Sequence, residues 1–351
     1  MIVAAVQLTS FRSYERLELS LTPGLVLAVG PNGVGKTNLL EALHVGTQGF
    51  SPRTRADAQL IRFGGQRARV AVQGRRAEVG ISLEVTLEAG AGKQAKLNGA
   101  PLRTAEQLRR EVSTLVFTPD RLGVVKGPPA VRRAYFDRTT ARLVPARAQL
   151  SADYGGSIAQ RNAALRRAAA GLSPRDAIAP WTEQVAVLGA ALVSARRETL
   201  SLVAPGFAER AGELGLAEAS LRYEAEAPTV AALEARLERD LDRGVTGLGP
   251  HLDDVAILAG GRDLRSFGSQ GEQRLAVLAL LLAEAELLAE RTGVPPLLLL
   301  DDVLSELDPA RRRILAARVG GAGQALVTAT DAAMLPAEPD QLVEVSPGTA
   351  R

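Results

Sequence analysis

Residues 30–37 carry the groups that a protein needs to bind a nucleoside triphosphate. The run Gly-Pro-Asn-Gly-Val-Gly-Lys-Thr follows the apolar segment 25–29, which predicts a strand leading into a phosphate-binding loop (P-loop). Glycines let the backbone N–H groups point at phosphate oxygens, Lys36 supplies a cation, and Thr37 offers a hydroxyl to Mg²⁺. A helix starting near Asn38 directs its positive dipole end at the anion. The predicted nucleotide contacts are Gly30, Asn32, Gly33, Gly35, Lys36, Thr37 and Asn38.

Two adjacent carboxylates follow a second apolar run near the end of the sequence. Residues 296–300 are typical of a strand that is buried on both faces of a parallel sheet, so its carboxyl end would lie beside the P-loop. We predict that Asp301 binds Mg²⁺ together with Thr37, and that Asp302 orients or deprotonates the attacking water. Clustered carboxylates are costly without a cation nearby, which argues against a purely structural pair.

A second candidate phosphate site precedes this strand. Ser269 begins the run Ser-Gln-Gly-Glu-Gln, which leads into the helical pattern 274–291. Ser269 can cap that helix and Gly271 lets the backbone approach a ligand, so this helix N-terminus suits a phosphate. The motif is weak evidence by itself, but its position before Asp301 and before the run Ser-Glu-Leu-Asp at 305–308 strengthens it.

Together these motifs resemble those of the ATP-binding-cassette (ABC) ATPases, in which the serine-glycine signature of one subunit closes over nucleotide held by another. Within that superfamily the chain is similar to the chromosome-maintenance branch, and most of all to the RecF family of bacterial recombination mediators. Thr330 stands in place of the switch histidine, Leu252 follows His251 where the family usually has arginine, and no glutamine-loop residue is obvious near 118–120. The matching blocks span nearly the whole chain, at residues 8–14, 30–43, 118–120, 126–128, 132–133, 249–254, 269–274 and 301–308.

The resemblance implies an α/β fold: an ABC-type P-loop ATPase head with a mixed sheet, helices and antiparallel strands, and no long coiled coil. We place the ATPase lobe at residues 1–125 and 245–351, with a compact α-helical lobe at 126–244. It also implies catalytic roles for Lys36, Asp302 and, in trans, Ser269, and nucleotide contacts from Ser269 and Gly271.

The function implied by the resemblance is ATP-controlled DNA binding. An ATP-dependent homodimer would clamp DNA, either duplex, gapped or at a junction of single and double strands, and slow DNA-dependent ATP hydrolysis would release it. The task would be recombinational repair of gaps and stalled forks, including the SOS response, with RecO and RecR as partners that load the recombinase. ATP and Mg²⁺ are the expected cofactors.

Composition sets further limits. The 351 residues allow two domains, and the absence of cysteine with only two histidines excludes disulfides and the common zinc sites. Basic residues cluster: seven arginines lie within 53–76, and ten basic residues within 120–167. Clusters with few aromatic neighbours fit a phosphate backbone, although a solvated helix face explains either cluster equally well. The predicted DNA contacts are Arg53, Arg55, Lys93, Lys96, Arg132 and Arg133.

Hydrophobic periodicity predicts a strand-rich first part and a helical insert. We expect strands at 2–8, 16–21, 25–29, 69–72 and 79–88, and a hairpin with basic tips at 89–99. Helical spacing covers 135–150, 181–203 and 230–241, with breaks at Pro145, 155–156, Pro174, 205–206 and Pro228. The best apolar candidate for a membrane span, 275–289, is interrupted by two glutamates, so we expect a cytoplasmic protein with no membrane partner.

Two other classes remain alternatives. An ABC-type motor of a transporter usually needs a switch histidine and a glutamine loop, which the sequence does not show. A nuclease or bridging subunit of the long coiled-coil type needs sustained heptads, whereas the insert is broken repeatedly by proline and glycine.

Overall fold

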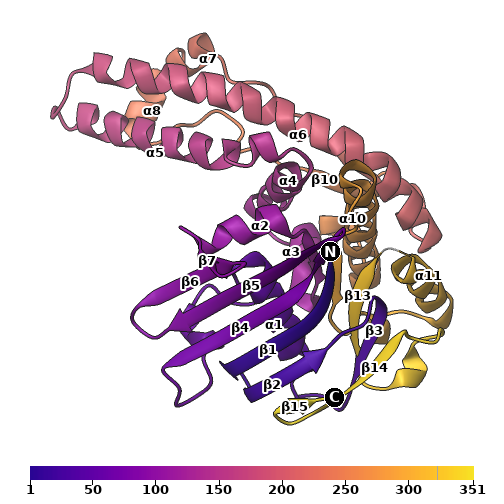
Figure 1. Ribbon diagram of the computed structural model, residues 1–351. Helices are drawn as coiled ribbons and strands as arrows, with labels where there is room; N and C mark the ends of the chain where they lie inside the picture. Colours follow the sequence, from indigo (N-terminus) through magenta and orange to yellow (C-terminus); the bar gives the residue numbers. More distant parts are fainter. Residues whose placement is uncertain (322) are drawn as a thin grey trace. The chain divides into compact units, whose positions relative to one another are not determined.

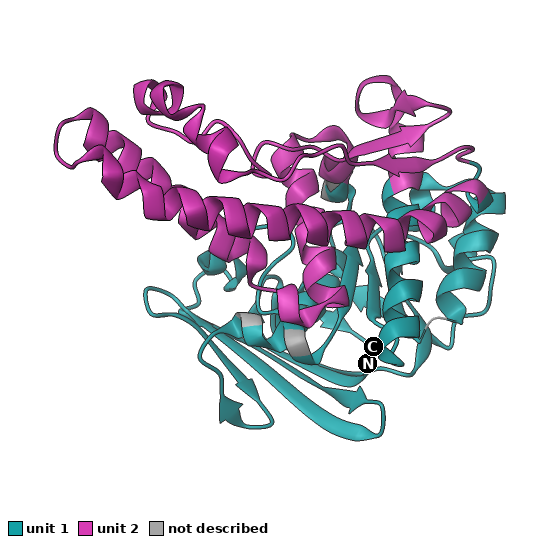
Figure 2. Ribbon diagram, turned by 90° about the horizontal axis from the view of Figure 1, so that it is seen from above, with its two compact units in different colours: residues 1–121, 213–215, 277–351 teal, residues 122–212, 216–276 magenta. Residues whose placement is uncertain are grey.

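The structure, a computed structural model, describes residues 1–321 and 323–351 and divides into two compact units, which Figure 2 colours separately. Unit 1 comprises residues 1–121, 213–215 and 277–351, and unit 2 comprises 122–212 and 216–276. The predicted helical lobe, 126–244, lies in unit 2 except for residues 213–215. Its limits stay a prediction, because a compact unit need not coincide with a domain.

An antiparallel sheet forms one layer of unit 1 (Figure 1). The hairpin predicted at 89–99 exists, but its two lysines lie within strand β6 rather than at a tip, because the turns fall at 89–91 and 98–99. Apolar residues of the central strands alternate toward the interior. In spatial order the strands are β2 (Tyr14–Ser20), β1 (Ile2–Phe11), β4 (Arg67–Arg76), β5 (Val79–Glu88), β6 (Gly92–Leu97) and β7 (Ala100–Pro101).

The second sheet of unit 1 is mostly parallel and carries the nucleotide motifs. All residues of β12 and β13 are buried, which explains why β12 reads as a continuous apolar run. β13 is apolar except for Gln324 and Thr328. β13 lies between the strand that leads into the P-loop and the strand that ends at Asp301. The order is β15 (Thr349–Ala350), β14 (Gln341–Ser346), β3 (Gly24–Val29), β13 (Gln324–Ala329), β12 (Leu297–Leu300) and β8 (Thr114–Phe117).

Helix α1 (Lys36–Gln48) contributes to a hydrophobic core shared by both sheets, and 11 of its 13 residues are buried. Gly46 is required where the helix meets β4, since a Cβ there would come within 2.9 Å of the side chains of Val70 and Val72. Unit 1 also contains η1 (Asp57–Leu60), η2 (Ala105–Gln107), α2 (Leu108–Glu111), η6 (Val303–Glu306), α11 (Pro309–Gly320) and η7 (Ala332–Met334).

Unit 2 is predominantly helical, and among the described residues its longest helix is α6, with 35 residues. A small antiparallel sheet of β9 (Ser220–Arg222), β10 (Ala256–Ala259) and β11 (Arg262–Asp263) accompanies the helices. Helix α10 (Gln270–Thr292) begins in unit 2 and continues into unit 1. The other elements are η3 (Pro119–Leu122), which begins in unit 1, α3 (Gly123–Lys126), α4 (Pro129–Leu143), η4 (Pro145–Arg147), α5 (Leu150–Ala169), η5 (Arg175–Ile178), α6 (Ala179–Glu213), α7 (Val230–Glu234), α8 (Leu237–Arg243) and α9 (Leu264–Phe267).

Two predicted helix breaks are wrong. The structure confirms the break at Pro145, but α5 continues through Gly155 and Gly156, and α6 continues through Pro205. Proline inside a helix removes one hydrogen bond, a cost that packing can offset. Val203, Phe207 and Ala211, spaced four residues apart on one face of α6, are all buried. Tertiary packing therefore overrides the local preference.

The two glycines within α5 predict a stabilising substitution. Both are exposed and helical, and a Cβ added at either would meet no other described atom within 4 Å, so alanine fits without strain. Gly155→Ala and Gly156→Ala should each raise the free energy of unfolding by about 0.5–1 kcal/mol, because glycine loses more backbone entropy in a helix. Urea unfolding followed by circular dichroism measures the change. A lower unfolding midpoint in either variant would contradict this account.

The helical unit contains arginines in its interior. Arg161 and Asp240 form an ion pair of 2.8 Å with side chains 0% and 1% exposed, and Arg161 also donates to Thr182 and Thr246. Arg196 pairs with Asp137 at 2.7 Å. These contacts revise the interpretation of the basic cluster at 120–167, since part of its charge is used inside unit 2.

One helical stretch, Arg175–Glu213, is long and apolar enough to span a membrane by length and composition alone, among the residues the structure describes. The core helix of a globular protein meets the same criteria. Arg196 lies in this stretch and is buried against Asp137, which suits packing within a protein interior.

Candidate nucleotide site

The P-loop leaves β3 and enters α1 as predicted. Gly30, Gly33 and Gly35 have φ angles of +155°, +83° and +118°, in the region that favours glycine. At Gly35 a Cβ would lie 2.9 Å from Ser13 Oγ and 3.1 Å from the hydroxyl of Tyr14, which donates to the Gly35 carbonyl at 3.0 Å. The turn between β1 and β2 therefore packs directly against the loop and fixes its shape.

The Lys36 ammonium is wrapped by its own loop. Nζ donates to the carbonyl oxygens of Gly30 at 2.6 Å and Pro31 at 2.9 Å. Burial lowers the pKa of Lys36, and the nearby carboxylates of Asp302 and Asp301 oppose that shift. The loop thus holds the ammonium beside the cavity that Lys36 lines together with Asp301 and Asp302.

Asp301 lies against the first turn of α1. The hydroxyls of Thr37 and Thr328 donate to its Oδ1 at 3.0 and 2.8 Å. Burial raises the pKa of Asp301, while the two hydroxyl hydrogen bonds oppose the rise. The structure thus brings together the two residues predicted to hold Mg²⁺, although they are 264 positions apart in the sequence.

Asp302 follows with a left-handed backbone, φ 50° and ψ 27°, and its amide donates to Thr328 Oγ1 at 2.8 Å. Its Oδ1 is buried without a hydrogen-bond partner among the described residues. A buried carboxylate oxygen is costly unless it meets a donor or a cation, so this oxygen fits a site for Mg²⁺ or a bound water. Asp302 lines a cavity of about 220 Å³, shared with Asn32, Gly33, Gly35, Lys36, Thr37, Asn38, Arg53, Asp301 and Thr328.

Thr328 was not predicted. It lies on β13 between the P-loop strand and the Asp301 strand, is fully buried, and contacts both aspartates. The signal that could have revealed it is a threonine within a strand whose other central residues are apolar. Thr330, which occupies the place of the switch histidine, instead donates to Met334 Sδ at 3.2 Å.

Glu41 on α1 organises the arginines at one end of this site. It is 0% exposed and accepts hydrogen bonds from Arg12 at 2.8 Å, Ser51 at 2.6 Å and Arg53 at 3.3 Å. A fully buried carboxylate requires such partners. Glu41 therefore holds two cations next to the P-loop helix.

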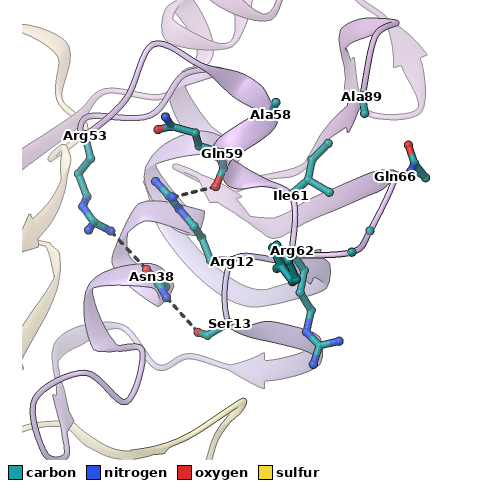
Figure 3. A pocket seen from close by; sticks show the side chains of 13 residues that line it. Arg12, Ser13, Asn38, Arg53, Ala58, Gln59, Ile61, Arg62, Gln66 and Ala89 are labelled. Atoms are coloured by element: carbon teal, nitrogen blue, oxygen red, sulfur yellow. Dashed lines mark hydrogen bonds between the residues drawn. The ribbon is translucent and has the colours of Figure 1, made fainter.

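A larger cavity of about 740 Å³ adjoins the site and shares Asn38 and Arg53 with it (Figure 3). Arg53 donates to Asn38, and Asn38 donates to Ser13 at 2.9 Å, forming a chain of polar side chains along one wall. Arg12 donates to the Gln59 carbonyl at 2.8 Å on the other side. Helix α1, the turn between β1 and β2, and the segment after α1 thus contribute to one polar wall.

The raised pKa of Asp301 leads to a test of its role. A carboxyl whose pKa is raised on folding binds a proton more tightly in the folded chain, so stability falls as pH rises from the unfolded pKa through the folded one. Asp301→Asn removes that charge and should flatten this part of the stability curve. Without nucleotide at pH 7–8, its thermal midpoint should equal or exceed that of the wild type, while Mg²⁺ should no longer strengthen nucleotide binding.

Calorimetric scans from pH 4 to pH 8 measure the first effect, and nucleotide titrations with and without Mg²⁺ measure the second. Asp331→Asn is the control, because that exposed carboxylate lies outside the cavity. Retention of the Mg²⁺ effect in Asp301→Asn would remove Asp301 from the metal site.

Ser269 and Gly271 belong to unit 2. Ser269 Oγ accepts the Glu272 amide at 3.2 Å, and Glu272 Oε2 accepts the Ser269 amide at 2.8 Å, a reciprocal capping box that confirms the predicted cap. These hydrogen bonds lower the pKa of Glu272. Ser269 and Gly271 are exposed, so both are accessible to a ligand, and their catalytic and nucleotide-binding roles stay a prediction.

The predicted DNA contacts have different environments. Arg55 and Arg53 are exposed, and Arg53 pairs with Glu41 at 3.3 Å. Lys93 pairs with Asp57 at 3.1 Å and Lys96 with Glu84 at 3.3 Å. The Lys93 side chain is 19% exposed and that of Lys96 48%, so Lys96 is the more accessible of the two lysines.

Arg132 requires a correction. Its side chain is 3% exposed, forms a two-pronged ion pair with Asp254, and donates to the carbonyls of Val125 and Gly127. Burial and complete pairing argue against a DNA contact, so we remove Arg132 from the predicted set. Arg133 is half-buried and donates to the Asp253 carbonyl.

His251 is likewise internal to unit 2. Its two ring nitrogens lie 2.8 Å from the Tyr154 hydroxyl and 2.9 Å from the Thr246 carbonyl. Burial lowers the pKa of His251.

These features define a class of protein, the ABC-type ATPase head. They are a P-loop and an aspartate pair at the carboxyl edge of one mostly parallel sheet, an accompanying antiparallel sheet, and a capped Ser-Gln-Gly helix start. The structure confirms the predicted α/β fold without a long coiled coil in its described residues. The family model described as RecF/RecN/SMC N terminal domain matches residues 2–350. The chain belongs to the RecF family.

Individual relatives support this family assignment. The DNA replication and repair protein RecF of Symbiobacterium thermophilum is 38% identical, covering 94% of this chain and 92% of its own length. That of Heliobacterium modesticaldum is 34% identical, covering 90% and 88%. A solved structure of the recombination mediator protein RecF with ATP, in the RecFOR pathway, has a TM-score of 0.90 at 27% identity and covers 99% of this chain and 96% of that one. An Smc head bound to a ScpA domain, at 18% identity, 100% and 96% coverage and a TM-score of 0.62, shares the fold.

Proposed function

We propose that this chain is an ATP-dependent DNA-binding protein of recombinational repair that hydrolyses ATP slowly. Two copies bind ATP between them and close on DNA, and hydrolysis releases the DNA. The observation that carries the proposal is the joint placement of Thr37, Asp301 and the unpartnered Asp302 oxygen beside the P-loop. The names of its relatives support DNA repair as the task, and a cytoplasmic location is part of this proposal.

In this mechanism each residue has a separate role. Backbone N–H groups of the P-loop and Lys36 bind the phosphates, and Thr37 with Asp301 would hold Mg²⁺, which neutralises charge on the phosphate oxygens. Asp302 orients the attacking water. Arg53, steadied by Glu41, adds positive charge beside Asp301, and the Coulombic influence of Arg53 on the pKa of Asp301 supports that proximity.

Closure depends on the signature of the second copy. The exposed start of α10 offers Ser269 and the amide end of a long helix to the phosphates held by the first copy. Because the complete site exists only in the dimer, ATP affinity and dimerisation are coupled. RecO and RecR are the proposed protein partners, and gapped or junction DNA is the proposed substrate beside plain duplex. The RecFOR pathway of the structural relative supports these partners.

Ser269→Arg tests the shared site. The bulky cation at an exposed helix start should leave ATP binding by the P-loop intact and prevent the second copy from docking. Light scattering should show ATP-dependent dimers for the wild type and monomers for Ser269→Arg, and the variant should lose ATP-dependent retention of duplex DNA. Ser266→Arg, at a nearby exposed serine, serves as the control and should still dimerise. Dimers of normal affinity from Ser269→Arg would refute the shared site.

A further inference from the structure

The turn that follows Asp302 must hold an uncommon backbone conformation. Left-handed φ and ψ at a residue other than glycine cost about 1 kcal/mol or more, so surrounding contacts have to maintain them. The turn η6 (Val303–Glu306) comes next, and Val303, Leu304 and Leu307 are buried as its anchors. The position of the Asp302 carboxylate therefore depends on how firmly this turn is fixed.

Hydrogen bonds fix the turn at both ends. At its start, the Asp302 amide donates to Thr328, and Ser305 Oγ donates to the Asp302 carbonyl at 2.8 Å. At its end, Nε of Arg312 donates to the carbonyl oxygens of Leu304 at 2.8 Å and Leu307 at 2.9 Å. One charged group thus joins two carbonyls at the end of the turn: that of Leu307, and that of Leu304, which also accepts the Leu307 amide at 3.3 Å.

Arg312 connects the turn to the sheet. It lies in the first turn of α11, which is next to β3 and β13 and has buried residues Leu315, Ala316 and Val319. β13 carries Thr328, so both fixation points of the turn lead to the same strand. A guanidinium is rigid and always charged, and a charge-assisted hydrogen bond is stronger than a neutral one.

We propose that Arg312 is a positioning residue for Asp302, which keeps the turn at 302–307 in the geometry that presents the carboxylate to the nucleotide site. The inference rests on the proposed function, since it concerns the residue assigned to hydrolysis. Arg313, the next residue, is the matched control: it is exposed and donates to the Pro309 carbonyl at 3.3 Å, within its own helix.

Hydrogen exchange tests the position of the turn without relying on ATP turnover. In Arg312→Met, amides of residues 302–307 should exchange at least tenfold faster than in the wild type, while those of α1 keep their rates. Arg313→Met should leave both segments unchanged. Unchanged exchange at 302–307 in Arg312→Met would overturn the proposal, and equal acceleration throughout unit 1 would show a merely structural role.

ATP kinetics form the second arm. Arg312→Met should lower kcat about tenfold and leave the Kd for ATP within twofold of the wild type, because the P-loop is intact. Equal loss of affinity and turnover, or wild-type turnover, would contradict the positioning role. Absence of hydrolysis in the wild type itself would refute the proposed function, and the exchange data would still decide the role of Arg312.

Discussion

Asp302→Asn should bind ATP with near wild-type affinity, hydrolyse it at least about 100-fold more slowly, and accumulate as an ATP-bound dimer. Asparagine keeps the size and the backbone contact to Thr328 but lacks the charge that orients or accepts a proton from water. Because only hydrolysis opens the proposed dimer, blocking it should trap whatever ATP assembles. Mass measurement in solution with and without Mg-ATP, together with single-turnover hydrolysis, provides the check.

The control is Lys36→Ala, which should remain monomeric because it cannot hold the phosphates. An Asp302→Asn chain that binds ATP yet shows no change of mass would mean that closure requires DNA or a protein partner, or that Ser269–Gln273 is not a signature. Wild-type turnover in Asp302→Asn would assign water activation to another group.

Arg161→Met should destabilise the protein by about 3–5 kcal/mol. The substitution removes the cation that pairs with the Asp240 carboxylate, which is 1% exposed. The carboxylate would keep its hydrogen bond from the Gly247 amide at 3.1 Å but would remain a buried, uncompensated charge. The double variant Arg161→Met with Asp240→Asn should recover a large part of the loss, since no buried charge remains. Urea unfolding followed by circular dichroism measures all variants on the same scale.

Arg175→Met is the matched control on the same unit. Arg175 and Glu238 form an ion pair with side chains 62% and 71% exposed, and such surface pairs contribute less than about 1 kcal/mol. A cost for Arg161→Met as small as that of Arg175→Met would contradict the assigned role of the buried pair.

Local patterns made the nucleotide site predictable. The P-loop needs eight consecutive residues after one strand, and the aspartate pair needs one apolar run, so each is readable without knowledge of the fold. The reciprocal capping of Ser269 and Glu272 is equally local, since the two residues are three positions apart. A motif contained in one short segment can therefore be recognised from the sequence alone.

Burial of charged residues was not predictable in the same way. In the sequence, Arg132 cannot be distinguished from a surface arginine, because its ion-pair partner Asp254 lies 122 positions away. The predicted helix breaks at Gly155 and Pro205 were wrong for a related reason. Glycine and proline disfavour a helix by about 1–3 kcal/mol, which is less than the free energy that a long helix gains by packing.

The sequence was enough to predict a nucleotide-binding loop, an acidic pair for metal and water, a capped serine-glycine helix start, and the ABC-type fold that carries them. Other residues at the site became visible only once the chain was folded. Thr328, Glu41 and Arg312 contact groups that strand order and helix packing bring together. Thr37 and Thr328, for example, both donate to Asp301 although they lie near opposite ends of the sequence. Contacts between remote segments depend on the whole fold, whereas a motif depends on its own few residues.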